Sequence, residues 1–346
     1  MPRLVVRVPN WLGDIVMALP AIAAIRAAHP GAHLALAGPA AFAPFCAAIA
    51  GVDHVVGLTG KGIRALGTHA RQLAEGRFDR AILLTNSFAS ALAVKRAGIP
   101  ERWGYRRDLR GPLLTRAVRP TRPSGESRHH SRYYLRLVEA LGIPAVAGEW
   151  TVTPPDDALS RADALLAEAG YTGGEPLVAF APGAAYGYAK RWPPGRVAEA
   201  IAALTADGVR VAIVGAASDR PTARAIQSAL VPRRPSVPVV DLVGRTDLLA
   251  LMGVLARSRV VVSNDSGAMH VASAVGRPVV AVFGPTDERA TAPLGTHAIV
   301  RHDVWCRPCL LRECPIDHRC LRGVTAGQVV EAVRTQLARN GGATQT

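Results

Sequence analysis

The regular alternation of short apolar runs with segments of helical spacing constrains the fold of this chain more than any other feature. In the N-terminal part, these runs are LVVRV (4–8), HLALAG (33–38), HVVGL (54–58) and RAILLTN (80–86). Strands that are covered on both faces of a parallel sheet have such nearly continuous apolar sequences. The segments between them, such as ALPAIAAIRAAHP (18–30), have helical spacing and end in Pro or Gly. The pattern therefore predicts a βαβα arrangement around a parallel sheet.

A second series of the same kind follows, with the runs LVAFAPG (177–183), RVAIVG (210–215), PVVDLVG (238–244), RVVVSND (259–265), PVVAVFGP (278–285) and HAIVRH (297–302). The two series are joined by TVTPPDDALSRADALLAEAG (151–170), a polar, Pro-containing connection that leads into one helix. We therefore expect a boundary near 155–172, which divides the chain into domains 1–160 and 161–346. The last helical pattern, at 326–340, could return to the first domain.

Together the two series predict an α/β protein with two Rossmann-like, doubly wound domains whose parallel sheets face each other across a cleft. The 346 residues with 49% hydrophobic content suit two domains of ordinary size. Ligands of such sheets bind at the carboxyl ends of the strands. The residues that follow the predicted strands are therefore the candidates for a functional site.

The net charge of +15 indicates an anionic partner, although a preference for arginine over lysine would also produce it. Aromatic side chains lie at the two ends of the most basic stretch and are not interleaved with its cations, which favours a phosphate- or carboxylate-rich ligand over stacked bases. The arginines of that stretch are Arg102, Arg106, Arg107, Arg110, Arg116, Arg119, Arg122, Arg128 and Arg132.

The sequence begins directly with a strand pattern and shows no signal-peptide pattern, and no apolar run is long enough to span a bilayer. We therefore expect a cytoplasmic protein whose membrane association, if any, is peripheral.

The turn NWLGD (10–14) follows the first predicted strand and carries Gly13 and Asp14. Glycine permits a tight bend or the close approach of a ligand, and aspartate at a helix start satisfies free N–H groups. The local sequence favours a helix cap over a catalytic carboxylate, and both interpretations stay open at this point.

Two segments of the second series predict an anion site. A strand ends at Asp265, and Ser266, Gly267 and His270 then open a helix whose N–H groups suit a diphosphate. In FAPGAAYGYAKRWPP (180–194), a Gly-rich loop ends in Lys190, which could neutralise a leaving diphosphate. For the first segment, the structural alternative is a capped helix in which His270 is a packed core residue. For the second, it is a solvated basic pair of Lys190 and Arg191.

GKGIRA (60–65) resembles a dinucleotide fingerprint, but it follows the third predicted strand and carries charged residues. The sequence contains neither a P-loop motif nor an Asp-x-Asp at a strand end.

Four cysteines lie at C-x2-C-x4-C-x5-C spacing, and a structural zinc or cluster, redox-sensitive disulfides and free thiols all remain open for them. They are Cys306, Cys309, Cys314 and Cys320, whereas Cys46 is predicted to be an ordinary buried thiol.

Four long segments, PNWLGDIVMALPAI, LLTNSFASALAVKRAGIPERWGYRRDLRGPLLT, PGAAYGYAKRWPP and SNDSGAMHVASAVGRPVVAVFGPT, resemble the lipopolysaccharide heptosyltransferases of glycosyltransferase family nine, especially the heptosyltransferase II branch. The resemblance implies a GT-B fold and an inverting transfer of heptose from ADP-heptose to the inner core of lipopolysaccharide at the cytoplasmic membrane face. It implies neither a metal nor another cofactor for catalysis, and no nucleic acid partner.

Carried onto this sequence, the resemblance makes Asp14 the general base and lets the Gly13 backbone lie close to the sugars. Lys190 would stabilise the departing diphosphate and Asp265 would hold the heptose. The other donor contacts implied are Gly183, Thr246, Ser266, Gly267 and His270, and the acceptor contacts are Lys61, Arg64, Asn86 and Ser87.

Alternatives to this reading differ in acceptor or in chemistry. Heptosyltransferase I and other family-nine transferases use a different acceptor. GKGIRA would support a nicotinamide-dependent oxidoreductase, and the net charge alone would support a nucleic-acid-binding protein.

Overall fold

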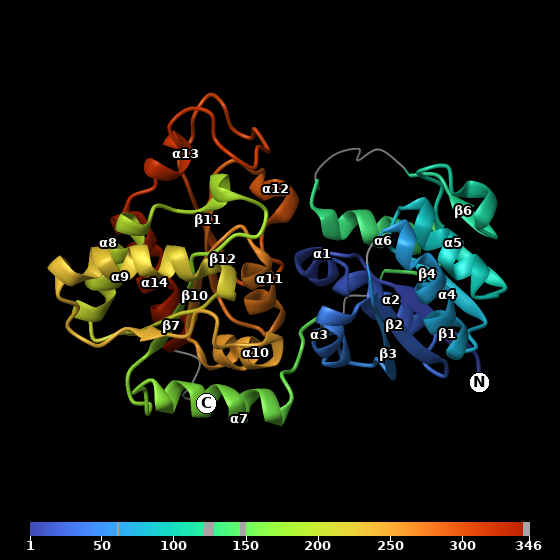
Figure 1. Ribbon diagram of the computed structural model, residues 1–346, viewed down its shortest axis with the longest axis horizontal. Helices are drawn as coiled ribbons and strands as arrows, with labels where there is room; N and C mark the ends of the chain where they lie inside the picture. Colours follow the sequence, from blue (N-terminus) through green and yellow to red (C-terminus); the bar gives the residue numbers. More distant parts are fainter. Residues whose placement is uncertain (61, 121–127, 146–149, 342–346) are drawn as a thin grey trace. The chain divides into compact units, whose positions relative to one another are not determined.

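The computed structural model describes residues 1–60, 62–120, 128–145 and 150–341 (Figure 1). Over these residues the chain forms two compact units, Met1–Thr153 and Pro154–Thr346. The predicted boundary at 160/161 falls within the first helix of the second unit, α7 (Asp156–Glu168).

Within the described residues, the first unit contains a six-stranded parallel sheet with the order β3-β2-β1-β4-β5-β6. Its strands are β1 (Arg3–Arg7), β2 (His33–Pro39), β3 (His54–Leu58), β4 (Arg80–Leu83), β5 (Glu101–Tyr105) and β6 (Arg116–Val118). Its α-helices are α1 (Leu12–Met17), α2 (Leu19–Ala28), α3 (Ala43–Ala47), α4 (Leu66–Glu75), α5 (Phe88–Arg96) and α6 (His130–Ala140).

The described part of the second unit repeats this topology, with the order β12-β11-β10-β7-β8-β9. Its strands are β7 (Leu177–Ala181), β8 (Arg210–Ile213), β9 (Val240–Asp241), β10 (Val260–Asn264), β11 (Val279–Phe283) and β12 (His297–Arg301). Its helices after α7 are α8 (Pro194–Ala206), α9 (Arg220–Leu230), α10 (Leu248–Arg257), α11 (Gly267–Ala274), α12 (Glu288–Thr291), α13 (Arg319–Arg322) and α14 (Ala326–Gly341).

All ten strands predicted from apolar runs are present, which confirms the two parallel sheets. In the second sheet, β7, β10 and β11 are buried along their whole length because helices cover both faces. Strands β5 and β6 were not predicted, since ERWGY and RAV are short and carry charged side chains. The charged side chains of β6 are tolerated because it is the edge strand of the sheet, next to β5.

The last helix, α14, packs against α8 and strands β10, β11 and β12 of its own unit. The sequence had allowed this helix to return to the first domain. Over the described residues, no helix combines the length and the apolar character needed to cross a membrane.

In both units the strands follow the Rossmann order 3-2-1-4-5-6, in which the winding direction reverses between the first and fourth strands. The reversal lies between β1 and β4 in the first unit and between β7 and β10 in the second. Segments that leave these neighbouring strands diverge to opposite faces of the sheet, and the divergence opens a crevice for a ligand. The candidate sites are therefore expected after β1, β4, β7 and β10.

Candidate functional site

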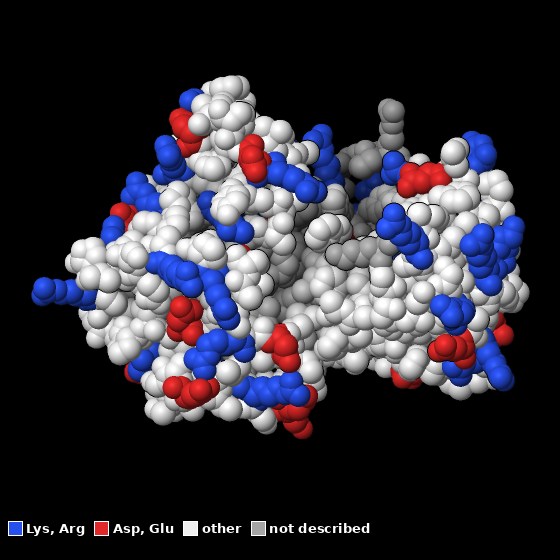
Figure 2. Space-filling view, in the orientation of Figure 1, with Lys and Arg blue, Asp and Glu red and all other residues white. Residues whose placement is uncertain are grey.

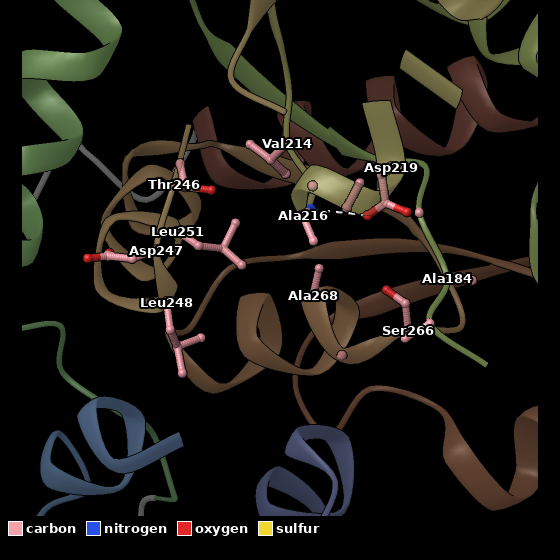
Figure 3. Close-up of a pocket in the computed structure, with 15 residues that line it drawn as sticks. Ala184, Val214, Ala216, Asp219, Thr246, Asp247, Leu248, Leu251, Ser266 and Ala268 are labelled. Carbon is pink, nitrogen blue, oxygen red and sulfur yellow. Dashed lines mark hydrogen bonds between the residues drawn. The ribbon is translucent and has the colours of Figure 1, made fainter. Parts of the chain in front are cut away.

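A pocket of about 280 Å³ lies where β7 and β10 end in the second unit (Figure 3). Figure 3 shows Ser266 and Ala184 at one end of it, and Thr246, Leu248 and Leu251 at the other. The remaining lining residues are Ala181, Gly183, Ala185, Val214, Gly215, Ala216, Asp219, Asp247, Gly267 and Ala268. The structure thus brings together four of the predicted donor-site residues, Gly183, Thr246, Ser266 and Gly267.

The polar end of the pocket is formed by the start of α11. The N-cap residue Ser266 is extended, and its Oγ lies 3.1 Å from Ser263 Oγ, which belongs to β10. Gly267 and Ala268, the first two residues of the helix, line the pocket. Main-chain N–H groups at a helix start carry partial positive charge, so this end of the pocket suits an anion such as a phosphate.

The Gly-rich loop after β7 approaches the pocket closely at Gly183. A Cβ at this position would lie 2.3 Å from Asp219 Oδ2, so a larger residue would displace the Asp219 carboxylate. The same carboxylate accepts a hydrogen bond from the Ala216 N–H at 3.1 Å, drawn as a dashed line in Figure 3. Asp219 was missed in the sequence because the Asp in GAASDR has the appearance of an ordinary helix-start residue.

Asn264, the last residue of β10, holds both ends of the Gly-rich loop. Its Nδ2 donates to the Pro182 carbonyl at 2.6 Å, and its Oδ1 accepts from the Trp192 N–H at 3.1 Å. The residue is 2% exposed. Asn264 therefore fixes where the loop begins and ends relative to α11, a role that nothing in the sequence pattern indicated.

Lys190 and Asp265 form an ion pair beside the pocket. Lys190 Nζ donates to Asp265 Oδ2 at 2.6 Å, and Thr286 Oγ1 donates to the same oxygen at 2.7 Å. Lys190 also lies over the Tyr186 ring, 4.7 Å from its centroid. The pair joins the end of the Gly-rich loop to the end of β10, which places a cation near the start of α11.

His270 is the one predicted donor residue that the structure buries inside a helix. It is 4% exposed and is not among the residues that line the described pocket. The placement agrees with the structural alternative, a packed histidine on the inner face of α11.

In the first unit, Asp14 follows β1 and lies in the first turn of α1. The N-cap of this helix is Trp11, whose indole offers no oxygen to a main-chain N–H, so Asp14 is not the cap residue. Its side chain is 31% exposed, and His130 Nδ1, at the start of α6, lies 3.9 Å from Asp14 Oδ1. Burial raises the pKa of nearby Tyr134, and the negative charge of Asp14 adds to that shift.

Asn86 and Ser87 follow β4, the strand next to β1. Asn86 Oδ1 accepts from Tyr133 Oη at 3.0 Å, and Ser87 caps α5 by accepting from the Ser90 N–H. Arg64 is exposed in a short 3-10 helix at Ile63–Ala65. Lys61 lies outside the described residues. The GKGIRA segment follows β3, at the edge of the sheet and away from the reversal point, which disfavours a dinucleotide site there.

The arginine-rich stretch is only partly a surface feature. Arg110 is 0% exposed, donates to the carbonyls of Tyr105 and Thr85, and has its pKa lowered to about 10 by burial. Arg102 donates to the carbonyls of Ile99, Pro100 and Leu113. On the face in Figure 2, acidic side chains lie among the basic ones over both units. Arg102 and Arg110 therefore stabilise the first unit through hydrogen bonds to main-chain carbonyls.

The four clustered cysteines lie together in the structure. Cys306, Cys309, Cys314 and Cys320 line one small cavity, of about 20 Å³, and all are free thiols together with Cys46. Among the described residues, no three His, Cys, Asp or Glu side chains are arranged to hold a metal ion. Of the alternatives that the spacing left open, a structural zinc or cluster finds no support in the described residues.

The topology and the pocket define a class: an α/β protein of two Rossmann-like units, the second of which has a pocket with a helix start at one end and apolar side chains at the other. Three comparisons specify it further. The family model for glycosyltransferase family 9 (heptosyltransferase) matches residues 66–319. Lipopolysaccharide heptosyltransferase 2 of Salmonella typhimurium is 32% identical over 303 residues, which are 84% of this chain and 85% of the relative.

Lipooligosaccharide heptosyltransferase 2 of Haemophilus influenzae is also 32% identical, over 84% of this chain and 86% of its own length. The solved structure of ADP-heptose lipopolysaccharide heptosyltransferase II from E. coli superposes with a TM-score of 0.80 at 28% identity, covering 99% of this chain and 100% of that one. The chain belongs to glycosyltransferase family 9 and has the GT-B fold of its structural neighbours.

Proposed function

We propose that this glycosyltransferase transfers L-glycero-D-manno-heptose from ADP-heptose to the heptosyl-Kdo2-lipid A inner core of lipopolysaccharide. The relatives named heptosyltransferase 2 support this acceptor, since they match more than four fifths of the chain at 32% identity. The observation that carries the donor assignment is the pocket after β7 and β10, with the Lys190–Asp265 pair beside it.

In this proposal the donor lies in the pocket with its diphosphate at the start of α11. The main-chain N–H groups of Gly267 and Ala268 and the Lys190 ammonium would face the phosphates. Thr246, Leu248 and Leu251 would line the adenosine end, where apolar side chains suit a base. Asp265 would accept hydrogen bonds from the heptose hydroxyls.

The transfer step needs a base, a nucleophile and a stabilised leaving group. Asp14 would take the proton of the acceptor hydroxyl as its oxygen attacks the anomeric carbon of the donor. The bond from that carbon to the diphosphate oxygen breaks, and ADP leaves with the electron pair and the negative charge, which Lys190 and the α11 N–H groups stabilise. Attack opposite to the leaving group inverts the anomeric configuration.

The acceptor would bind to the first unit, where Gly13, Asn86 and Ser87 follow the adjacent strands β1 and β4. Lys61 and Arg64 would contact its anionic groups. Because the acceptor is a lipid, the protein would work at the cytoplasmic face of the inner membrane as a peripheral protein, and its charge of +15 favours an anionic surface. Catalysis in this scheme uses no cofactor.

The test is ADP release from ADP-heptose by purified protein with two acceptors, heptosyl-Kdo2-lipid A and Kdo2-lipid A. We expect release with the first, and an inverted linkage by NMR. Preference for Kdo2-lipid A would indicate a heptosyltransferase I activity instead, and no release with either acceptor would overturn the proposal.

The base is tested by Asp14→Asn. Loss of a general base lowers turnover by roughly 100-fold or more, while the donor affinity should persist. Asp108→Asn is a matched control, because Asp108 is exposed in the same unit. Near-normal turnover of Asp14→Asn would show that this carboxylate has only a structural role in the first turn of α1.

A further inference from the structure

Residues 303–318, in the connection between β12 and α13, contact the Gly-rich loop that ends at Lys190 and the turn between β11 and α12, whose Thr286 donates a hydrogen bond to Asp265. We call this segment the cysteine loop, because it contains Cys306, Cys309 and Cys314. The function proposed above leaves this loop without a role.

On one side the cysteine loop holds the Gly-rich loop that ends at Lys190. The Ala189 N–H donates to the Arg312 carbonyl at 3.0 Å, and Tyr186 Oη donates to the Leu310 carbonyl at 2.8 Å. At Gly187, whose φ is +157°, a Cβ would lie 2.3 Å from the Arg312 oxygen. These contacts fix the main chain immediately before Lys190, and the Tyr186 ring lies under its ammonium group.

On the other side the cysteine loop holds the turn between β11 and α12. Arg307 is 6% exposed, and its guanidinium donates to the Gly284 carbonyl at 2.6 Å and the Thr286 carbonyl at 3.1 Å. It also donates to Glu288 Oε2 at 2.9 Å, and the Leu310 N–H donates to the Pro285 carbonyl at 2.9 Å. The turn carries Thr286, whose hydroxyl donates to Asp265.

We propose that the cysteine loop is a brace that holds Lys190 and Asp265 in the geometry that binds the donor diphosphate, with Arg307 and Tyr186 as positioning residues. Lys190 ends the Gly-rich loop, and Asp265, which follows β10, accepts a hydrogen bond from Thr286 in the turn between β11 and α12. The Gly-rich loop and this turn are both fixed by hydrogen bonds to the cysteine loop, so the brace reduces the number of arrangements that Lys190 can adopt. The cysteines contribute by packing, since their cavity is also lined by Ala189 and Pro285, one from each braced loop.

The proposal rests on the donor site proposed above, and ADP affinity measured by calorimetry tests it. Arg307→Gln removes the positive charge and the forked donors that hold the turn between β11 and α12. We expect the affinity for ADP to fall roughly tenfold, which corresponds to the loss of one or two hydrogen bonds of a charged group. Arg307→Lys should recover part of the affinity. Tyr186→Phe removes only the hydroxyl and should weaken binding roughly threefold.

A positioning role predicts that these losses depend on Lys190. In a Lys190→Met background, Arg307→Gln should change ADP affinity less than about twofold, because interacting sites are not additive. Arg289→Gln is the matched control, since Arg289 is exposed and pairs with Asp287 on the same turn. Unchanged affinity in Arg307→Gln, or an equal loss in both backgrounds, would overturn the brace.

A second readout does not depend on nucleotide binding. The sequence contains three lysines, Lys61, Lys95 and Lys190, and Lys190 is 12% exposed while it is paired. Loosening the brace should raise the rate of acetic anhydride labelling of Lys190 several-fold relative to exposed Lys95, in Arg307→Gln and in Tyr186→Phe. Wild-type protein that fails to bind ADP would contradict the proposed function, whereas unchanged labelling in both variants would contradict the brace.

Discussion

Lys190 Nζ lies 2.6 Å from Asp265 Oδ2, and the two side chains are 12% and 5% exposed. An ion pair with so little solvent interacts strongly, and removal of one partner leaves an uncompensated charge. Thr286 donates to the same carboxylate oxygen, so Asp265 would retain one hydrogen bond without Lys190.

Lys190→Met should therefore weaken both stability and nucleotide binding. We expect the free energy of unfolding to fall by about 2–4 kcal/mol because Asp265 is left buried and unpaired, and ADP affinity to fall roughly tenfold or more with the loss of a charged donor. Urea denaturation and calorimetry measure the two effects. Adding Asp265→Asn should recover stability without recovering ADP affinity, and a double variant less stable than the single one would contradict the pairing.

Arg110→Met should destabilise the first unit. The guanidinium is fully buried and donates to the carbonyls of Tyr105 and Thr85. The Tyr105 carbonyl would keep the Arg107 N–H as a donor, whereas the Thr85 carbonyl would lose the donor that Arg110 supplies. We expect a loss of about 2–3 kcal/mol, because unsatisfied buried acceptors keep their desolvation cost. Thermal unfolding measures it, with Arg107→Met as the exposed control from the same stretch. Equal melting temperatures for the two variants would contradict a structural role for Arg110.

Asp53 should give the first unit an acid-sensitive contribution to stability. A hydrogen bond from the Leu34 N–H lowers the pKa of its carboxyl, and the nearby positive charge of Arg26 lowers it further. A carboxyl whose pKa is lower in the folded than in the unfolded chain stabilises the fold above its unfolded pKa of about 4. This stabilisation is lost as the pH falls through the lower pKa of the folded state. The stability advantage of the wild type over Asp53→Asn should therefore shrink below about pH 4. Urea denaturation at pH 3–6 measures it; an advantage that grows on acidification would refute the assignment.

The five thiols should differ in reactivity. Cys46 is 1% exposed, and burial raises its pKa to about 12, so it stays protonated and inaccessible at pH 8. Burial also raises the pKa of Cys320. Alkylation followed by peptide mass spectrometry should modify half-buried Cys306, Cys309 and Cys314 first, and Cys46 only after unfolding. Protection of all four clustered thiols, with metal found by elemental analysis, would contradict the free-thiol state of the structure.

Several site residues were predictable because they follow strands that the apolar pattern locates. Gly183, Ser266 and Gly267 line the pocket, since the carboxyl ends of β7 and β10 meet at one edge of the sheet. Asp219 and Asn264 were not recognised, because their roles depend on main-chain atoms of Gly183, Pro182 and Trp192 that are distant in sequence.

The sequence by itself determined the two parallel sheets, the order of the strands along the chain and the family, because apolar periodicity and long motifs are local properties. Tertiary structure alone decided that Arg110 is buried, that His270 faces the interior of its unit and that the four cysteines lie between the loops of Lys190 and Thr286. Burial and pairing depend on which segments meet in space, and the free energy of a charge or a thiol depends on those neighbours more than on its own sequence.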